Sequence, residues 1–160
     1  MRGSPMGTAA GRIVLPDAPV TIRATALPTR SSTELLSAAR QGLVEATVAG
    51  TVAERYSLAH LAALRAAAAV LAARARPTGH RRGRPASVWT LLAEVAPALE
   101  EWAQFFAAGA AKRAAADAGL PAVTQRESDD LLRDAETFLE VVEAALAGAS
   151  QPLLTAATGG

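Results

Sequence analysis

Apolar residues recur every three or four positions in four stretches of the chain, which is the spacing of one face of an amphipathic helix. Capping and turn residues bound these stretches, and they predict helices over residues 31–50, 51–75, 87–119 and 124–148. No window alternates apolar and polar residues as a half-exposed strand does, and alanine far outnumbers valine and isoleucine. The pattern therefore predicts an all-α protein.

Three of the predicted helices begin with the same capping signal. A Ser or Thr stands three residues before a Glu, so that each side chain can satisfy a backbone N–H of the other. The pairs are Ser31 and Glu34, Thr51 and Glu54, and Thr124 and Glu127. The third helix contains Pro97, which lacks a backbone N–H, so this helix should be kinked or split near Ala96. Four helices with mostly short links predict an antiparallel four-helix bundle.

Both ends of the chain lack this helical period. Residues 1–30 contain four prolines and keep no period of 2 or 3.6, and residues 149–160 end in Gly-Gly. We therefore expect a flexible N-terminal arm over 1–30, a helical domain over 31–148 and a flexible tail over 149–160.

Composition narrows the chemistry by exclusion. The 160 residues include no Cys and two His, His60 and His80, which excludes disulfides, thiolate catalysis and a Cys-ligated or multi-histidine metal site. The formal net charge of +1 gives no general reason to expect nucleic acid or a membrane surface as a partner. The longest apolar run, from Ala66 to Ala73, is far shorter than the roughly 20 residues of a membrane-spanning helix. We expect a cytoplasmic protein that uses neither a metal nor a cofactor.

A basic stretch covers residues 74–84. Its cationic residues are Arg74, Arg76, His80, Arg81, Arg82 and Arg84. Arg clustered with Gly and Pro is a composition that binds phosphate without reading sequence, so RNA or a nucleotide is one candidate ligand. No aromatic residue is interleaved to stack on bases. The alternative is a solvated linker whose cations complement the C-terminal end of the second helix.

The second helix is apolar over most of its circumference beyond Ala66. Such a helix is buried, either at the centre of its own domain or against a second subunit. We therefore predict a homodimer.

Short motifs that serve as family markers lie along residues 33–147. They are Glu54-Arg55-Tyr56, the run from Ala59 to Leu71, Glu101-Trp102-Ala103, the run from Phe106 to Ala110, Lys112-Arg113-Ala114, Ala118-Gly119 and the run from Asp129 to Leu132. With these motifs the chain resembles a small actinobacterial family of HEPN-domain proteins. The resemblance implies a helical bundle. HEPN domains occur as ribonuclease toxins, as partners of nucleotidyltransferases and as RNA- or nucleotide-associated modules, and many pair into dimers.

Arg55 and His60 have the spacing of the metal-independent ribonuclease motif of HEPN domains, an Arg and a His separated by four residues. The resemblance implies that Arg55 holds the scissile phosphate and that His60 moves a proton near pH 7. Five positions on a regular helix turn by about 500°, which leaves the two side chains roughly 140° apart. They converge on one phosphate only if Arg55 reaches round or a second subunit contributes. The alternative is a solvent-exposed Arg at the helix start and a packed His.

Two features depart from the ribonuclease pattern. The motif lies on the second helix and not on the last long one, and Tyr56 follows the Arg where a small polar residue is usual. The sequence therefore predicts a HEPN-like, RNA- or nucleotide-associated protein that is either a metal-independent ribonuclease or a degenerate relative of one. The alternative is a catalytically silent, dimeric helical module that binds a protein partner.

Overall fold

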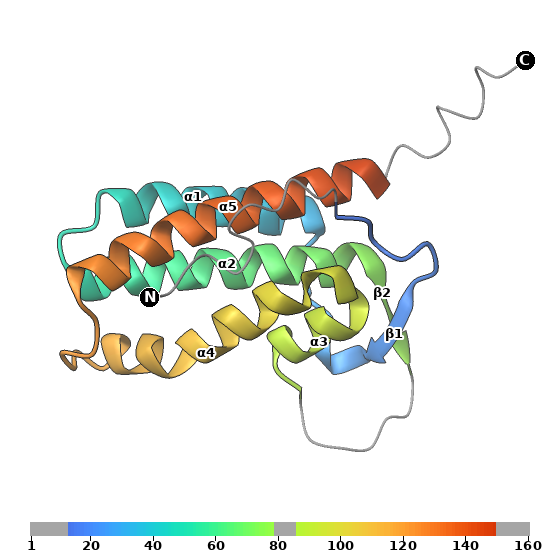
Figure 1. Ribbon diagram of the computed structural model, residues 1–160. Helices are drawn as coiled ribbons and strands as arrows, with labels where there is room; N and C mark the ends of the chain where they lie inside the picture. Colours follow the sequence, from blue (N-terminus) through green and yellow to red (C-terminus); the bar gives the residue numbers. More distant parts are fainter. Residues whose placement is uncertain (1–12, 79–85, 150–160) are drawn as a thin grey trace, which may run out of the picture.

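The computed structural model describes residues 13–78 and 86–149, and these residues form five α-helices and two short strands (Figure 1). In chain order they are β1 (Val20–Arg23), α1 (Ser32–Thr47), α2 (Val52–Arg74), β2 (Ala75–Thr78), α3 (Val88–Val95), α4 (Glu100–Asp117) and α5 (Gln125–Ala149). Two single-turn 3-10 helices lie at Ala24–Ala26 and Pro97–Leu99. The fold is therefore mostly helical, as the sequence predicts.

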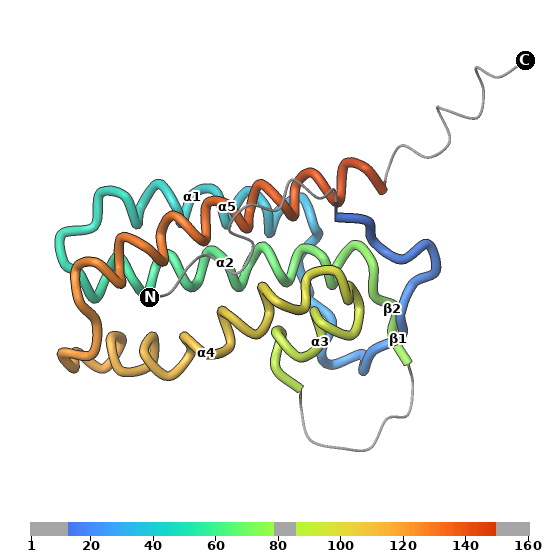
Figure 2. The backbone as a smooth tube through the Cα atoms, viewed as in Figure 1, coloured from blue at the N-terminus to red at the C-terminus, as the bar shows by residue number. Residues whose placement is uncertain are grey.

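Helix α2 occupies the centre of the fold and packs against α1, α3, α4 and α5. The chain runs back and forth along α1, α2, α4 and α5, so α2 and α5 point in the same direction and lie in direct contact (Figure 2). Alanines on α2 make the close approach possible, because Ala59, Ala63, Ala66 and Ala67 are almost fully buried. By length and composition α2 is the one described helix that could cross a membrane, but 56% of its most apolar window is buried by neighbouring elements of the chain.

The capping signals lie where the sequence places them. The Glu34 N–H donates to Ser31 Oγ over 3.1 Å, and the Ser31 N–H donates back to the Glu34 carboxylate. Thr124 and Glu127 exchange the same two bonds at the start of α5. At Thr51 the described structure has only the first bond, from the Glu54 N–H to the Thr hydroxyl. These bonds satisfy backbone donors that a helix start leaves unpaired.

The helix predicted over 87–119 is split at Pro97, as expected. Helix α3 ends at Val95, a 3-10 turn covers Pro97–Leu99, and α4 begins at Glu100. Proline has no N–H to continue the ladder and disfavours the helical conformation of the residue before it. Ala96 accordingly adopts φ −135° and ψ 80°, outside the helical region.

The expectation of an unstructured arm over residues 1–30 is wrong for residues 13–30. Strand β1 pairs in parallel with β2, with Val20 opposite Ala75, and Ile22 is fully buried in the core. Leu15 is 5% exposed. A four-residue strand such as β1 is too short to display an alternating pattern. Its partner β2 contains Pro77, and a proline is typical of a loop or an edge strand. The remainder of the predicted arm, residues 1–12, and residues 150–160 of the predicted tail lie outside the described residues.

Aromatic side chains fill the space between α3, α4 and α5. Trp102 stacks on Phe106 with ring centroids 6.0 Å apart, and Phe106 also stacks on Trp89 at 5.2 Å. Phe138 from α5 closes the cluster, 5.2 Å from Phe106. This cluster joins α3 and α4 to α5, and on the α2 side it borders the candidate site residue His60.

Candidate functional site

Arg55, the first residue of the candidate ribonuclease motif, lies between α1, α2 and α5. Its Nη1 donates to Asp129 Oδ1 over 2.6 Å, and its Nε donates to the carbonyl oxygen of Ala46 at the end of α1 over 3.3 Å. The side chain is 23% exposed. Two of the guanidinium nitrogens are thus engaged within the fold, and the carboxylate of Asp129 holds the position that an external anion would need.

His60 is directed to the opposite side of the site, toward α3 and α4. It is 2% exposed, and its Nε2 lies 2.8 Å from the carbonyl oxygen of Phe106. A carbonyl only accepts hydrogen bonds, so Nε2 carries the hydrogen and Nδ1 is the unprotonated nitrogen of the neutral ring. Nδ1 is buried and has no hydrogen-bond partner among the described residues. The ring also contacts Trp89 and Phe106 edge to face.

The surroundings of His60 favour its neutral form. Burial lowers the pKa of His60 from its ordinary value, and the positive charge of Arg113 lowers it further. The carbonyl of Phe106 and the carboxylate of Asp117 act in the opposite direction without outweighing burial. A general acid or base must reach the proton that it transfers. The enclosed imidazole has no such access in this arrangement.

The structure therefore does not bring Arg55 and His60 together on one surface. Arg55 contacts α1 and α5, whereas His60 contacts α3 and α4. The five-residue spacing on a regular helix produces this separation, since it turns the two side chains well apart. His60 is a packed histidine in this fold, which is one of the two alternatives that the sequence left open.

Gly109 was not singled out from the sequence, yet it sets the distance between α2 and α4. A Cβ at this position would lie 2.9 Å from the Tyr56 hydroxyl and 3.5 Å from His60 Cδ2. The Tyr56 hydroxyl donates to the Gly109 carbonyl at 3.5 Å. A glycine in the interior of an otherwise alanine-rich helix is the sequence signal for such a close approach.

The basic stretch is only partly within the described residues. Arg74, the last residue of α2, donates from Nη2 to the carbonyl oxygens of Pro16 and Asp17, the second over 3.2 Å. Arg76 is exposed and donates to the carbonyl oxygen of Ala75. The other predicted phosphate-binding residues, His80, Arg81, Arg82 and Arg84, lie outside the described residues.

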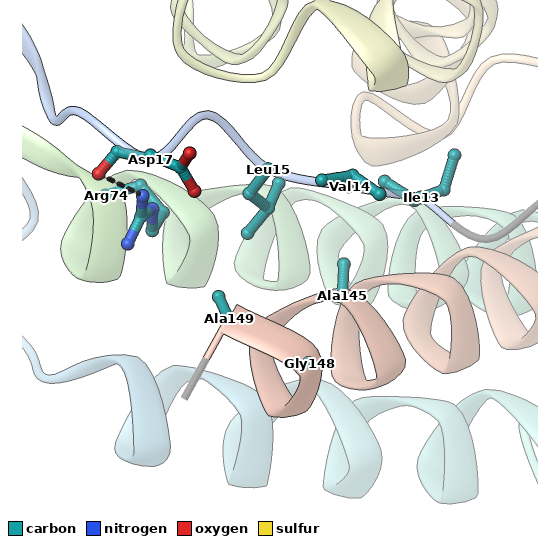
Figure 3. Close-up of a pocket in the computed structure, with 8 residues that line it drawn as sticks. All are labelled: Ile13, Val14, Leu15, Asp17, Arg74, Ala145, Gly148 and Ala149. Atoms are coloured by element: carbon teal, nitrogen blue, oxygen red, sulfur yellow. Dashed lines mark hydrogen bonds between the residues drawn. The ribbon is translucent and has the colours of Figure 1, made fainter. Parts of the chain in front are cut away.

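Arg74 also borders a cavity of about 390 Å³ (Figure 3). Residues 13–17 form one wall, and the last turns of α5 form the other. The lining residues are Ile13, Val14, Leu15, Asp17, Arg74, Ala145, Gly148 and Ala149. Sequence reasoning missed this cavity because it treated the segment before residue 31 as outside the fold.

A smaller hollow of about 70 Å³ lies between α2, α4 and α5. Lys112 and Glu127 form an ion pair of 2.6 Å at its edge, and Asp130 and Asp134 also line it. Within residues 13–78 and 86–149, no group of three or more His, Asp or Glu side chains is placed to hold a metal ion.

Comparison with protein families matches residues 46–143 to the SAV_6107-like HEPN family. The match covers more than half of the chain and includes both Arg55 and His60. Comparisons with curated proteins and with solved structures give no match.

Proposed function

Because the chain belongs to the SAV_6107-like HEPN family, we propose that it is a catalytically silent HEPN domain that acts by binding. In this proposal α1, α2, α4 and α5 constitute the antiparallel four-helix bundle of the domain, and the protein works in the cytoplasm. The single observation that carries the proposal is the separation of Arg55 from His60, each engaged inside the protein.

The state of Arg55 argues against a phosphate-binding role in cleavage. A scissile phosphate would have to displace Asp129 from the guanidinium or share it at the cost of like-charge repulsion. The position of His60 argues in the same direction. Its Nε2 is committed to the Phe106 carbonyl, and the other nitrogen is buried, so RNA reaches neither without moving α4 away.

An RNA-cleavage assay tests this proposal. Purified wild-type protein, incubated without metal with a generic single-stranded RNA, should leave the RNA intact. Preparations of His60→Leu and Arg55→Lys made in the same way control for contaminating nuclease. Cleavage by the wild type that both substitutions remove would overturn the proposal and restore the ribonuclease interpretation, because a lysine ammonium does not reproduce the guanidinium fork.

The binding role that we propose is the formation of a homodimer. Leu58, Leu61 and Leu64 recur at three-residue spacing on α2. Each is only partly buried within one chain, and Leu58 and Leu64 also pack against the core. A second copy would cover this apolar strip. The strip supports pairing because removing its remaining accessible apolar surface from water lowers the free energy.

Sedimentation of the wild type and of Leu61→Glu tests this pairing. We expect a dimer for the wild type at micromolar concentration and a monomer for Leu61→Glu. Val48→Glu is the matched control, since Val48 is 78% exposed on the outer side of the fold just after α1. A wild-type monomer would exclude the homodimer.

RNA or nucleotide binding through residues 74–84 is a second candidate. It is favoured by Arg76, whose side chain is exposed directly before the four remaining basic residues of the stretch. Affinity for a generic RNA should fall steeply with added salt, and replacement of Arg81, Arg82 and Arg84 by Ala should remove most of it. Salt-insensitive binding, or none at low salt, would leave the stretch a solvated linker.

A further inference from the structure

The His60 ring is buried between α2 and α4, with Nε2 bonded to the Phe106 carbonyl and Nδ1 unpartnered among the described residues, and we propose that this buried Nδ1 makes the docking of α3 and α4 on α2 depend on pH. The bond to the Phe106 carbonyl is possible in both charge states, because Nε2 carries a hydrogen in each. Protonation adds a second hydrogen at Nδ1. The effect of acid on the docking of α3 and α4 therefore depends on the surroundings of Nδ1.

Nδ1 has no acceptor available to it. The atom is buried and lacks a partner among the described residues, and the ring is 5.9 Å from Trp89 and 6.1 Å from Phe106 between ring centroids. A second N–H at this position would be a buried, unpaired donor on a charged ring. The protonated ring is thus poorly accommodated in the closed arrangement and well accommodated once water can reach it.

The charged groups near the ring do not remove this cost. Arg113 and Asp117 on α4 both act on His60, in opposite directions, and they form an ion pair of 3.5 Å with each other. From α3 the ring meets Trp89, which is uncharged, and on α2 the adjacent Tyr56 is bonded to the Gly109 carbonyl. Burial outweighs these influences and lowers the pKa of His60.

The polar links across the fold show which part should move. Arg55 with Asp129, Arg40 with Glu143, and the Ser128 hydroxyl with the Val52 carbonyl join α1, α2 and α5. Between α2 and α4 the corresponding hydrogen bonds are those of His60 and Tyr56. Lys112 and Glu127 join α4 to α5 at the far end of α4, 2.6 Å apart and partly exposed. Protonation at Nδ1 weakens the contact between α2 and α4, so α3 and the part of α4 around Phe106 should loosen from α2 while α1, α2 and α5 stay packed.

The sign of the effect follows from proton linkage. Above the ordinary His pKa of about 6.5 the ring is neutral in the closed and open forms, and pH has no influence through it. As pH falls below that value, the open form binds the proton more readily. The closing equilibrium then weakens by up to about tenfold per pH unit, until the pH passes the lowered pKa of the closed form.

Two readouts test the proposal on the full-length protein between pH 8 and pH 4.5. The chain has two histidines, so proton NMR gives two imidazole titrations, and His80→Ala assigns them. Trp89 and Trp102 report the packing of α3 and α4 through tryptophan fluorescence and near-UV circular dichroism, while far-UV circular dichroism reports the helices.

We expect His60 to titrate with a midpoint below 6.5, and the tryptophan and near-UV signals to change on acidification while most of the helical signal remains. His80→Ala should behave as the wild type. His60→Gln should show no acid-induced change in the tryptophan and near-UV signals, because the glutamine amide can donate to the Phe106 carbonyl and does not titrate. His60→Leu serves the same purpose if the glutamine variant does not fold.

Three results would overturn the proposal. The first is an unchanged acid transition in His60→Gln or His60→Leu, which would assign it to carboxylates. The second is titration of His60 at its ordinary value with constant tryptophan signals. The third is the simultaneous loss of near-UV and far-UV signals, which would show that the fold opens as one unit.

Discussion

Arg55 on α2 donates a hydrogen bond to Asp129 on α5 over 2.6 Å, and the two residues are 74 positions apart in the chain. Arg55 also donates to the Ala46 carbonyl, so one guanidinium joins three helices. The positive charge that the sequence motif associates with a phosphate is neutralised within the fold.

Replacing Asp129 by Asn should lower the free energy of unfolding by about 0.5–1 kcal/mol, because both partners retain contact with solvent. Urea denaturation measures the change. Asp130→Asn is a matched control on the same helix, since its arginine partners Arg126 and Arg133 are far more exposed and it should cost less. A loss of more than about 3 kcal/mol for Asp129→Asn would mean that the pair behaves as a buried ion pair.

Gly109→Ala should destabilise the protein although alanine is the better helix former. The added Cβ would lie 2.9 Å from the Tyr56 hydroxyl, and the Tyr56 ring is buried and cannot swing aside. Overpacking costs about 1–3 kcal/mol, against a gain of up to about 1 kcal/mol in helix propensity, so a net loss of about 1 kcal/mol is expected.

Thermal unfolding of Gly109→Ala combined with Tyr56→Phe tests the cause, because removing the hydroxyl should recover part of the loss. Gly50→Ala is the control, since nothing lies within 4 Å of its added Cβ. If Gly109→Ala is as stable as the wild type, the approach of α4 to α2 is looser than the structure describes.

Ile22→Ala should cost about 2–4 kcal/mol of stability, because the side chain is fully buried and its loss leaves a cavity. Thr21→Ala, one residue earlier on the exposed side of β1, should cost little. Equal effects of the two substitutions, measured by urea denaturation, would contradict the packing of β1 on the core.

Acid should destabilise the wild type relative to His60→Gln. The pKa of His60 is lowered in the folded protein, so the stability that the neutral ring contributes is present above about pH 6.5 and decreases as pH falls. The difference in unfolding free energy between the two proteins should change by up to about 1.4 kcal/mol per pH unit over that range. A constant difference from pH 7.5 to pH 5 would contradict the burial of His60.

The helix starts and the break at Pro97 could be predicted because they depend on residues close together in the chain. Ser31 with Glu34, and proline with the residue before it, act over one helical turn. The HEPN resemblance, carried by motifs such as Glu54-Arg55-Tyr56, is likewise confirmed by the family match over residues 46–143.

The sequence-based predictions that were wrong or incomplete concern residues whose environment is set by partners far away in the chain. Ile22 belongs to the core because β2, after α2, provides the strand beside it. Asp129 and Phe106 decide the states of Arg55 and His60, and no local pattern links either residue to its partner. The flexibility of residues 1–12 and 150–160, the homodimer and the ligand of residues 74–84 stay predictions.

The pairing of Val20 with Ala75 has a consequence for the order in which the protein folds. The whole α1–α2 hairpin lies between these two residues, so joining the strands in the unfolded chain closes a long loop and costs entropy. Once α1 and α2 have packed, the start of α1 and the end of α2 are already close together, and the strands pair with little further loss of chain entropy. The strand pair should therefore form after the rate-limiting step, and Ile22→Ala should accelerate unfolding while it leaves the refolding rate nearly unchanged.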